Sequence, residues 1–159
     1  MTTAGAAFPA NALPLRTLDD TLDLARTALQ ALPAGALLLL SGPLGAGKTT
    51  FTQALGKVLR VVAPVTSPTY TLVHEYPSPG GTLVHLDAYR LGSAEPLAGS
   101  MLDDYLERAR LVVVEWGEQL LAAYPEAWWL EFGFLDQPDG AGDEGNRLRY
   151  ARWRVTHPT

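Results

Sequence analysis

Residues 36–49 read ALLLLSGPLGAGKT, a short apolar run followed by a glycine-rich turn. The turn contains Gly42, then four residues, then Gly47, Lys48 and Thr49. This is the G-x-x-x-x-G-K-[ST] pattern of a phosphate-binding loop between a strand and a helix. Glycines let the backbone turn its N–H groups onto phosphate oxygens, and the N-terminus of the next helix favours the same anion. The stretch therefore predicts a nucleoside triphosphate site.

The expected ligands of this loop are a nucleoside triphosphate and Mg²⁺. Lys48 would place its positive charge on the β- and γ-phosphates, and the Thr49 hydroxyl would be a Mg²⁺ ligand. The residues expected to bind nucleotide are Gly42, Gly45, Ala46, Gly47, Lys48, Thr49 and Thr50. The alternative is a glycine-rich turn with an incidental lysine, which the flanking strand and helix disfavour.

Length and composition indicate a globular cytoplasmic protein. The chain has 159 residues, of which 47% are apolar and 18% charged, and we expect a single domain, 1–159, with 1–14 as a flexible tail or an edge segment. It contains no cysteine, which excludes disulfides and thiolate sites. We expect no membrane span, and no signal peptide because the first basic residue is Arg16.

The net charge of −5 disfavours independent binding to nucleic acid, which usually requires a basic face. Little chain remains for a substrate domain once a nucleotide site is built. We therefore expect a second protein component.

Strand and helix patterns alternate along the chain. Thr17 and Asp20 resemble a capping box for a helix reaching residue 32, and the helix after the loop ends near Arg60. Further helical segments are expected at 93–108 and 117–123, and strands at 69–76, 82–89, 111–115, 127–134 and 147–155. The pattern predicts an α/β P-loop NTPase fold, with a mainly parallel central sheet, an antiparallel hairpin over 69–89 and helices on both faces.

Two carboxylates end predicted strands. Glu115 closes the aliphatic run LVVVE, a pattern in which the acid holds Mg²⁺ or its waters at the carboxyl end of a buried strand. Asp87 ends the 82–87 strand and could bind Mg²⁺ through water or orient the water that attacks the γ-phosphate. The alternatives are a carboxylate that caps a strand and a strand-end turn residue.

Other polar residues carry weaker signals. Thr69 resembles a switch element that closes on the γ-phosphate, and an ordinary strand threonine is equally compatible. Arg90 could neutralise phosphate charge or pair with an acid. The histidines lack metal-ligand spacing and are interpreted as structural; they are His74, His85 and His157.

Four motifs together resemble the TsaE family: GPLGAGKTT at 42–50, SPTYTLV at 67–73, HLDAYRL at 85–91 and VEW at 114–116. The resemblance spans roughly residues 15–155. It implies an ATPase required for threonylcarbamoylation of the adenosine beside the anticodon in tRNAs that read codons starting with A. It also implies TsaB and TsaD as partners, which form the transferase, with ATP turnover resetting that complex between cycles.

The resemblance also implies roles for single residues. It makes Lys48 and Thr49 phosphate and Mg²⁺ contacts, Glu115 the second Mg²⁺ ligand, Asp87 catalytic or nucleotide-linked, and Thr69 switch-like. Arg147 is the nearest match to a basic residue that contacts nucleotide near the last strand of the family. This chain departs from the family at Pro96 and Ser100, which interrupt a helical stretch, and at the acidic loop 136–146, which looks like an insertion.

Three other functions use the same loop. A small-molecule or nucleotide kinase would need an acceptor pocket and usually a lid with several arginines. A GTPase is rejected because neither Asn11 nor Asn146 is followed by lysine, as guanine recognition by Asn-Lys-x-Asp requires. A nucleotide-gated binding module without catalysis stays open.

Overall fold

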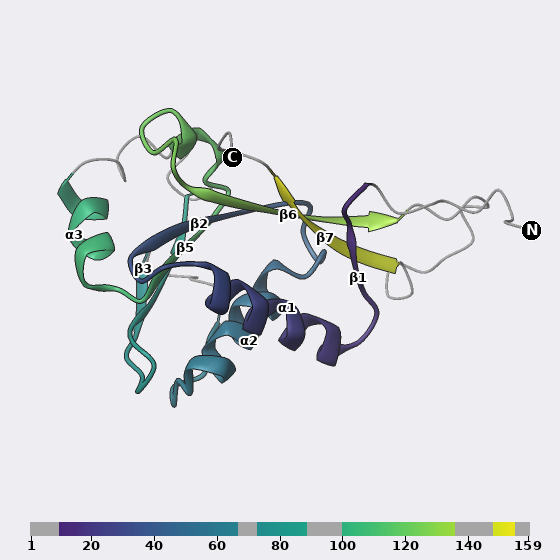
Figure 1. Cartoon of the computed structure of the whole chain (residues 1–159), viewed down its shortest axis with the longest axis horizontal. Helices are drawn as coiled ribbons and strands as arrows, with labels where there is room; N and C mark the ends of the chain where they lie inside the picture. The colour runs from purple at the N-terminus through teal and green to yellow at the C-terminus, as the bar shows by residue number, and fades with distance from the viewer. Residues whose placement is uncertain (1–9, 67–72, 89–99, 136–147, 155–159) are drawn as a thin grey trace, which may run out of the picture.

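The fold is a seven-stranded sheet with helices on both faces (Figure 1). The computed structural model describes residues 10–66, 73–88, 100–135 and 148–154. The strand order is β1-β7-β6-β2-β5-β4-β3. Among the described residues, helices long and apolar enough to cross a membrane are absent.

The centre of the sheet is parallel, which confirms the predicted P-loop fold. Its strands are β4 (Leu83–Asp87), β5 (Leu111–Glu115), β2 (Ala36–Ser41) and β6 (Trp128–Leu135). Every residue of β2 and β5 is buried, because helices or turns cover both faces, and this explains their unbroken aliphatic runs. Parallel alignment brings the carboxyl ends of these strands, and the polar residues found there, to one edge of the sheet.

Both outer parts of the sheet are antiparallel. The predicted hairpin is confirmed in β3 (Val73–Tyr76) and β4, although residues 69–72 of the expected strand lie outside the described residues. On the other side, β7 (Leu148–Arg154) pairs antiparallel with β6, and β1 (Leu13–Leu15) pairs with β7. This second antiparallel part was not predicted. It includes Leu13 and Pro14 from the segment expected to be a tail or an edge.

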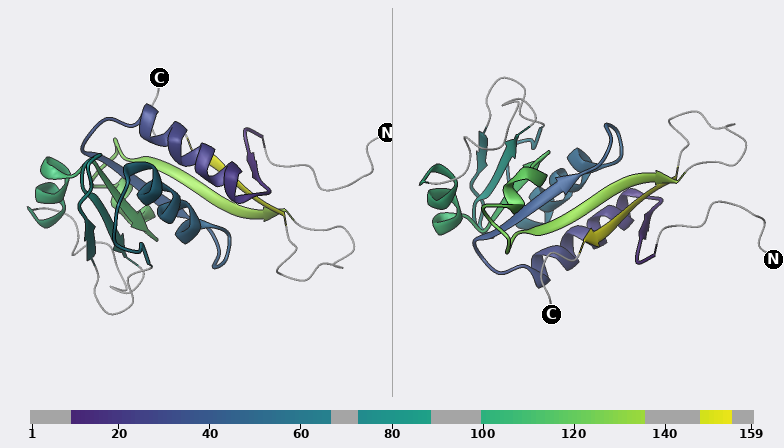
Figure 2. Two further views of the ribbon diagram at one scale, coloured as in Figure 1. Left: turned by 90° about the horizontal axis from the view of Figure 1, so that it is seen from below. Right: turned by 90° about the horizontal axis from the view of Figure 1, so that it is seen from above.

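Two helices cover one face of the sheet, α1 (Leu18–Ala31) and α2 (Lys48–Leu59). In the view from below they lie side by side in front of the strands, and in the view from above the strands lie in front of them (Figure 2). The capping box at the start of α1 is present: Asp20 N donates to Thr17 Oγ1, and Thr17 N donates to Asp20 Oδ2. These contacts satisfy free N–H groups and fix where α1 begins.

The opposite face is covered by α3 (Ser100–Arg108) and η3 (Glu118–Leu121). Leu102 and Leu120 enter an apolar cluster with alternate residues of β2, β4 and β5. Residues 93–99 of the expected helix lie outside the described residues. The helix expected over 117–123 is a shorter 3-10 helix. Gly117 comes just before it, and a Cβ added there would lie 2.8 Å from a side-chain carbon of Val114. The described helices on this face do not extend over β6 and β7, where a groove opens.

Candidate functional site

The loop between β2 and α2 depends on two glycines. Gly42 has φ +132° and Gly47 has φ +117°, values that L-residues with side chains rarely adopt. A Cβ on Gly42 would lie 2.3 Å from the carbonyl oxygen of Phe132 in β6, so the loop begins in direct contact with the neighbouring strand. Gly47 immediately precedes α2, whose first N–H groups lack partners within the helix. The predicted strand, loop and helix are thus all present.

Lys48, the first residue of α2, is buried although it carries charge. Its Nζ donates to the carbonyl of Gly42 and lies 4.0 Å from the centre of the Trp116 ring. Burial lowers the pKa of Lys48, and the nearby carboxylates of Glu115, Glu118 and Asp87 oppose that shift. The ammonium group of Lys48 is therefore a positive charge buried inside the loop, and the surrounding carboxylates balance it.

Asp87 and Glu115 are neighbours across the parallel strands β4 and β5. The pairing places both at the carboxyl edge of the sheet, beside the start of α2. Glu115 is 4% exposed, and its Oε2 is 2.7 Å from Nε2 of His85. The structure thus brings together three residues that the sequence singled out separately: Lys48, Asp87 and Glu115.

The oxygen groups at this edge fit a magnesium ion that arrives with a nucleotide. Within the described ranges, groups of three or more His, Asp or Glu side chains that could hold a metal are absent. Mg²⁺ bound with a nucleotide does not need such a group, because phosphates and water supply most of its ligands and one or two protein oxygens complete the set. The Thr49 hydroxyl, in the first turn of α2, and the Glu115 carboxylate are chemically suited to this task.

Several predicted site residues lie outside the described residues: Thr69, Arg90 and Arg147. A different arginine of the last strand reaches the loop. Arg149 Nε donates to the carbonyl of Gly45 at 2.9 Å, and its guanidinium carbon lies 5.3 Å from the centre of the Phe134 ring. Sequence reasoning missed this contact, because it depends on the place of β7 in the sheet. Two further arginines of the same strand, Arg152 and Arg154, both contact Glu131.

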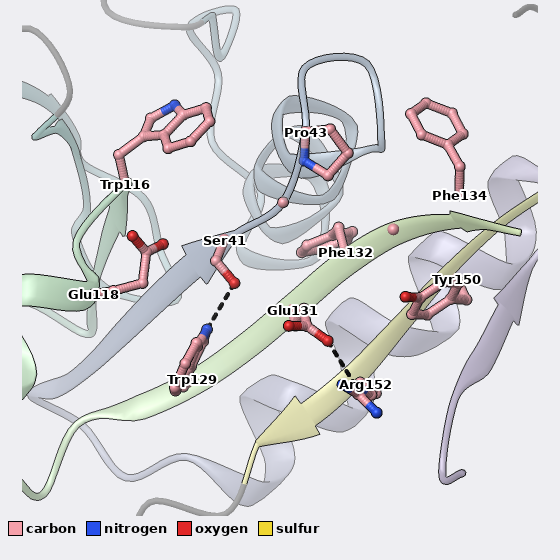
Figure 3. Close-up of a pocket in the computed structure, with 12 residues that line it drawn as sticks. Ser41, Pro43, Trp116, Glu118, Trp129, Glu131, Phe132, Phe134, Tyr150 and Arg152 are labelled. Atoms are coloured by element: carbon pink, nitrogen blue, oxygen red, sulfur yellow. Dashed lines mark hydrogen bonds and ion pairs between the residues drawn. The ribbon is translucent and has the colours of Figure 1, made fainter. Parts of the chain in front are cut away.

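An open groove of about 780 Å³ lies beside the loop, over β6 and β7. Trp116, Trp129, Phe134 and Tyr150 are among the side chains that line it (Figure 3). Trp129 Nε1 donates to Ser41 Oγ at 2.7 Å, which ties the groove wall to the start of the loop. The groove can therefore receive a planar or apolar group next to the phosphate loop.

Glu118 lines the same groove on the side of Trp116. Burial raises its pKa, whereas a backbone hydrogen bond and the charge of Lys48 lower it. The carboxyl group thus adds to the acids around the lysine, and sequence reasoning gave no signal for it beyond its position three residues after Glu115.

The chain is similar to known proteins of one family. Residues 15–139 match the family model described as threonylcarbamoyl adenosine biosynthesis protein TsaE. The chain is 42% identical over 106 residues to the tRNA threonylcarbamoyladenosine biosynthesis protein TsaE of Nostoc sp., covering 64% of this chain and 65% of the relative. The protein of the same name from Streptomyces coelicolor is 48% identical over 99 residues, covering 60% and 66% respectively. The matches thus span just under two thirds of each relative.

A solved structure is similar in fold. The crystal structure of Bacillus subtilis YdiB matches 91% of this chain and 84% of its own, with a TM-score of 0.58 and 25% sequence identity. From the loop, the carboxylate edge and these comparisons, we conclude that the chain belongs to the TsaE family of tRNA threonylcarbamoyladenosine biosynthesis proteins.

Proposed function

We propose that this chain is a Mg²⁺-dependent ATPase that acts on the TsaB–TsaD transferase complex in tRNA threonylcarbamoyladenosine biosynthesis. The observation that carries the proposal is the buried Lys48 at the start of α2, with Asp87, Glu115 and Glu118 around it. A glycine-rich loop, a buried cation and a helix N-terminus form a site for a polyphosphate. Family membership supports the pathway.

Binding would redirect Lys48. The ammonium now held by the Gly42 carbonyl and the Trp116 ring would turn to the β- and γ-phosphates, while loop N–H groups hold the other phosphate oxygens. Mg²⁺, when bound, would neutralise charge on the phosphates, and Thr49 and Glu115 would be its protein ligands.

Asp87 is the proposed water-positioning residue. It stands beside Glu115 in the strand register, on the same edge as the loop. From there its carboxylate would orient the attacking water and accept a proton from it. Thr69 is proposed to close on the γ-phosphate.

The proposed partners are TsaB and TsaD, with ATP turnover resetting their complex between cycles. The chain carries a net charge of −5, so we propose that tRNA is bound by that complex and not independently by this chain. Hydrolysis by the isolated chain should be slow, because an arginine supplied by a partner can account for about 10³-fold or more in phosphoryl transfer.

The proposal is tested by ATP hydrolysis of the purified chain, alone and with TsaB and TsaD, beside Glu115→Ala. We expect slow turnover alone, a clear change with the pair, and loss of turnover in the variant. Hydrolysis at kinase-like rates by the isolated chain, or a pair that neither binds nor alters turnover, would contradict it. Nucleotide that changes partner affinity without turnover would instead support a non-catalytic binding module.

The groove beside the loop favours one other candidate, a small-molecule or nucleotide kinase. An acceptor must lie next to the γ-phosphate, and the groove offers aromatic walls with Glu131 and Arg152 for a polar group. Incubation with ATP and a panel of metabolites and nucleotides tests this function. Transfer of phosphate to an acceptor would favour the kinase over the accessory ATPase.

A further inference from the structure

His85 is a buried polar residue in contact with the proposed metal ligand. It is 0% exposed, and its Nε2 lies 2.7 Å from Oε2 of Glu115 on the adjacent strand. We propose that His85 is a positioning residue, which donates from Nε2 to Glu115 and holds the carboxylate in the orientation that binds Mg²⁺ with nucleotide. This inference rests on the function proposed above.

Packing alone does not account for a histidine at this position. The neighbouring residues Val84 and Leu86 are fully buried, and His85 pairs in register with Val113. Its other ring nitrogen, Nδ1, is buried and has no hydrogen-bond partner among the described residues. An apolar side chain would fill the space without burying an unpaired polar atom, which is costly. The contact with Glu115 is what offsets that cost.

Glu115 needs such a contact because another group competes for it. The side chain is long and flexible, and Lys48 attracts it electrostatically. If the carboxylate turned to pair with the lysine, both charges would be drawn away from a nucleotide. The bond from His85 occupies Oε2 and leaves Oε1 for a cation or its water. Hydrogen-bonded groups behind a metal ligand commonly fix its orientation in this way.

The chain allows a matched set of variants. His85→Leu removes the donor and keeps an apolar side chain. His85→Gln places an amide nitrogen near the position of Nε2, whereas His85→Asn places it near Nδ1, too far from Glu115. His74→Leu is the control, because His74 lies directly opposite His85 in the β3–β4 pair and contacts the Tyr76 hydroxyl instead.

The measurement is the affinity for the non-hydrolysable ATP analogue adenylyl-imidodiphosphate, determined by calorimetry with Mg²⁺ and again with EDTA. The ratio of the two affinities reports the metal site independently of turnover. We expect His85→Leu and His85→Asn to reduce this ratio by about 10- to 100-fold, the usual effect of losing a group that orients a metal ligand. Binding in EDTA should change little, His85→Gln should retain most of the ratio, and His74→Leu should match the unmodified chain.

The outcomes separate this inference from the proposed function. An unmodified chain that binds the analogue equally with and without Mg²⁺ would overturn the proposed metal site, and the role of His85 with it. A normal ratio in His85→Leu would overturn the positioning role alone, even if that variant unfolds at a lower temperature. If His85→Leu does not fold, the Gln and Asn variants decide: a ratio equally low in both contradicts the proposal. In a Glu115→Gln background, His85→Leu should have no further effect on the ratio.

Discussion

At the scale of single residues, the site is organised by the charge of Lys48. Its ammonium is buried, and the acids nearby stabilise its charged form against burial. In the proposed function, a polyphosphate would bring additional negative charge to the same position. The lysine would then exchange its contacts with Gly42 and Trp116 for stronger bonds to phosphate oxygens.

We predict that Lys48→Ala weakens ATP binding by about 10- to 100-fold, which corresponds to the loss of a charge-assisted hydrogen bond. Calorimetric titration with ATP measures this change. Lys57→Ala is the control, because Lys57 is an exposed lysine in the last turn of the same helix. Equal effects of the two substitutions would show that the loss reflects overall charge.

Glu118 should make stability depend on pH. Its pKa is raised from the ordinary value of 4.5 chiefly by burial, so the folded state holds the proton more tightly than the unfolded state. Stability therefore falls as pH rises from the unfolded pKa through the folded pKa. We expect Glu118→Gln to raise the thermal unfolding midpoint at neutral pH and to lose this advantage in acid. Glu126→Gln, at an exposed position, is the control, and a gain that is equal at both pH values would refute the account.

The residues with local signals could be predicted, whereas those defined by tertiary contacts could not. Lys48 and Thr49 belong to one short motif, and Glu115 ends an aliphatic run. The contact of His85 with Glu115 joins two adjacent strands, β4 and β5, which are far apart in the sequence, so no local spacing pattern reveals it. Arg149 reaches the loop only because β7 folds back beside β6.

At the scale of elements, β6 supports the phosphate loop from the side. The carbonyl oxygen of Phe132 lies 2.3 Å from where a Cβ on Gly42 would be, and the Phe132 ring packs tilted against Phe51 of α2, with 5.6 Å between ring centres. The loop is therefore held between the end of β2, the start of α2 and the middle of β6. Such support keeps its N–H groups oriented before a ligand arrives.

Two glycine substitutions separate backbone strain from steric clash. Gly45 also has a positive φ, +82°, but a Cβ there would meet only the Phe134 ring, at 3.8 Å, whereas Gly42 would clash with a carbonyl at 2.3 Å. We expect Gly45→Ala to cost about 1 to 2 kcal/mol and Gly42→Ala roughly 1 to 3 kcal/mol more. Urea unfolding measures both. Similar costs would show that the contact with β6 is unimportant.

Most elements could be predicted from the sequence, but not all of their neighbours. Continuous aliphatic runs and turn signals identify β2, β5 and the β3–β4 hairpin. The second antiparallel pair was missed because the pairing of β6 with β7 joins segments separated by the acidic loop. No local pattern specifies which edge of the sheet the last strand joins.

At the scale of the whole molecule, the parallel centre of the sheet creates the site. It brings the ends of β2, β4 and β5 to one edge, where α2 begins, while the antiparallel strands extend the sheet and form the groove. The chain is small and acidic, so the proposed transfer chemistry is assigned to partner proteins.

Ligand binding should therefore stabilise the entire domain. With ATP at 100 times its dissociation constant, mass action adds about 2.7 kcal/mol to the stability of the folded state. For a chain of 159 residues we expect the unfolding midpoint to rise by roughly 5 to 10 °C. Differential scanning fluorimetry with ATP and Mg²⁺ checks this. ATP with EDTA should give a smaller shift, and equal shifts would argue against a role for the metal.

The most direct test of the proposed site is a crystal structure of the chain with Mg²⁺ and a non-hydrolysable ATP analogue. We predict that the triphosphate lies on the N–H groups of residues 42–49, with Lys48 Nζ turned from the Gly42 carbonyl to the phosphates. The cation should lie between Thr49 and Glu115, directly or through water, with Asp87 facing the γ-phosphate. A triphosphate bound elsewhere, or a cation remote from Glu115, would contradict the proposed mechanism.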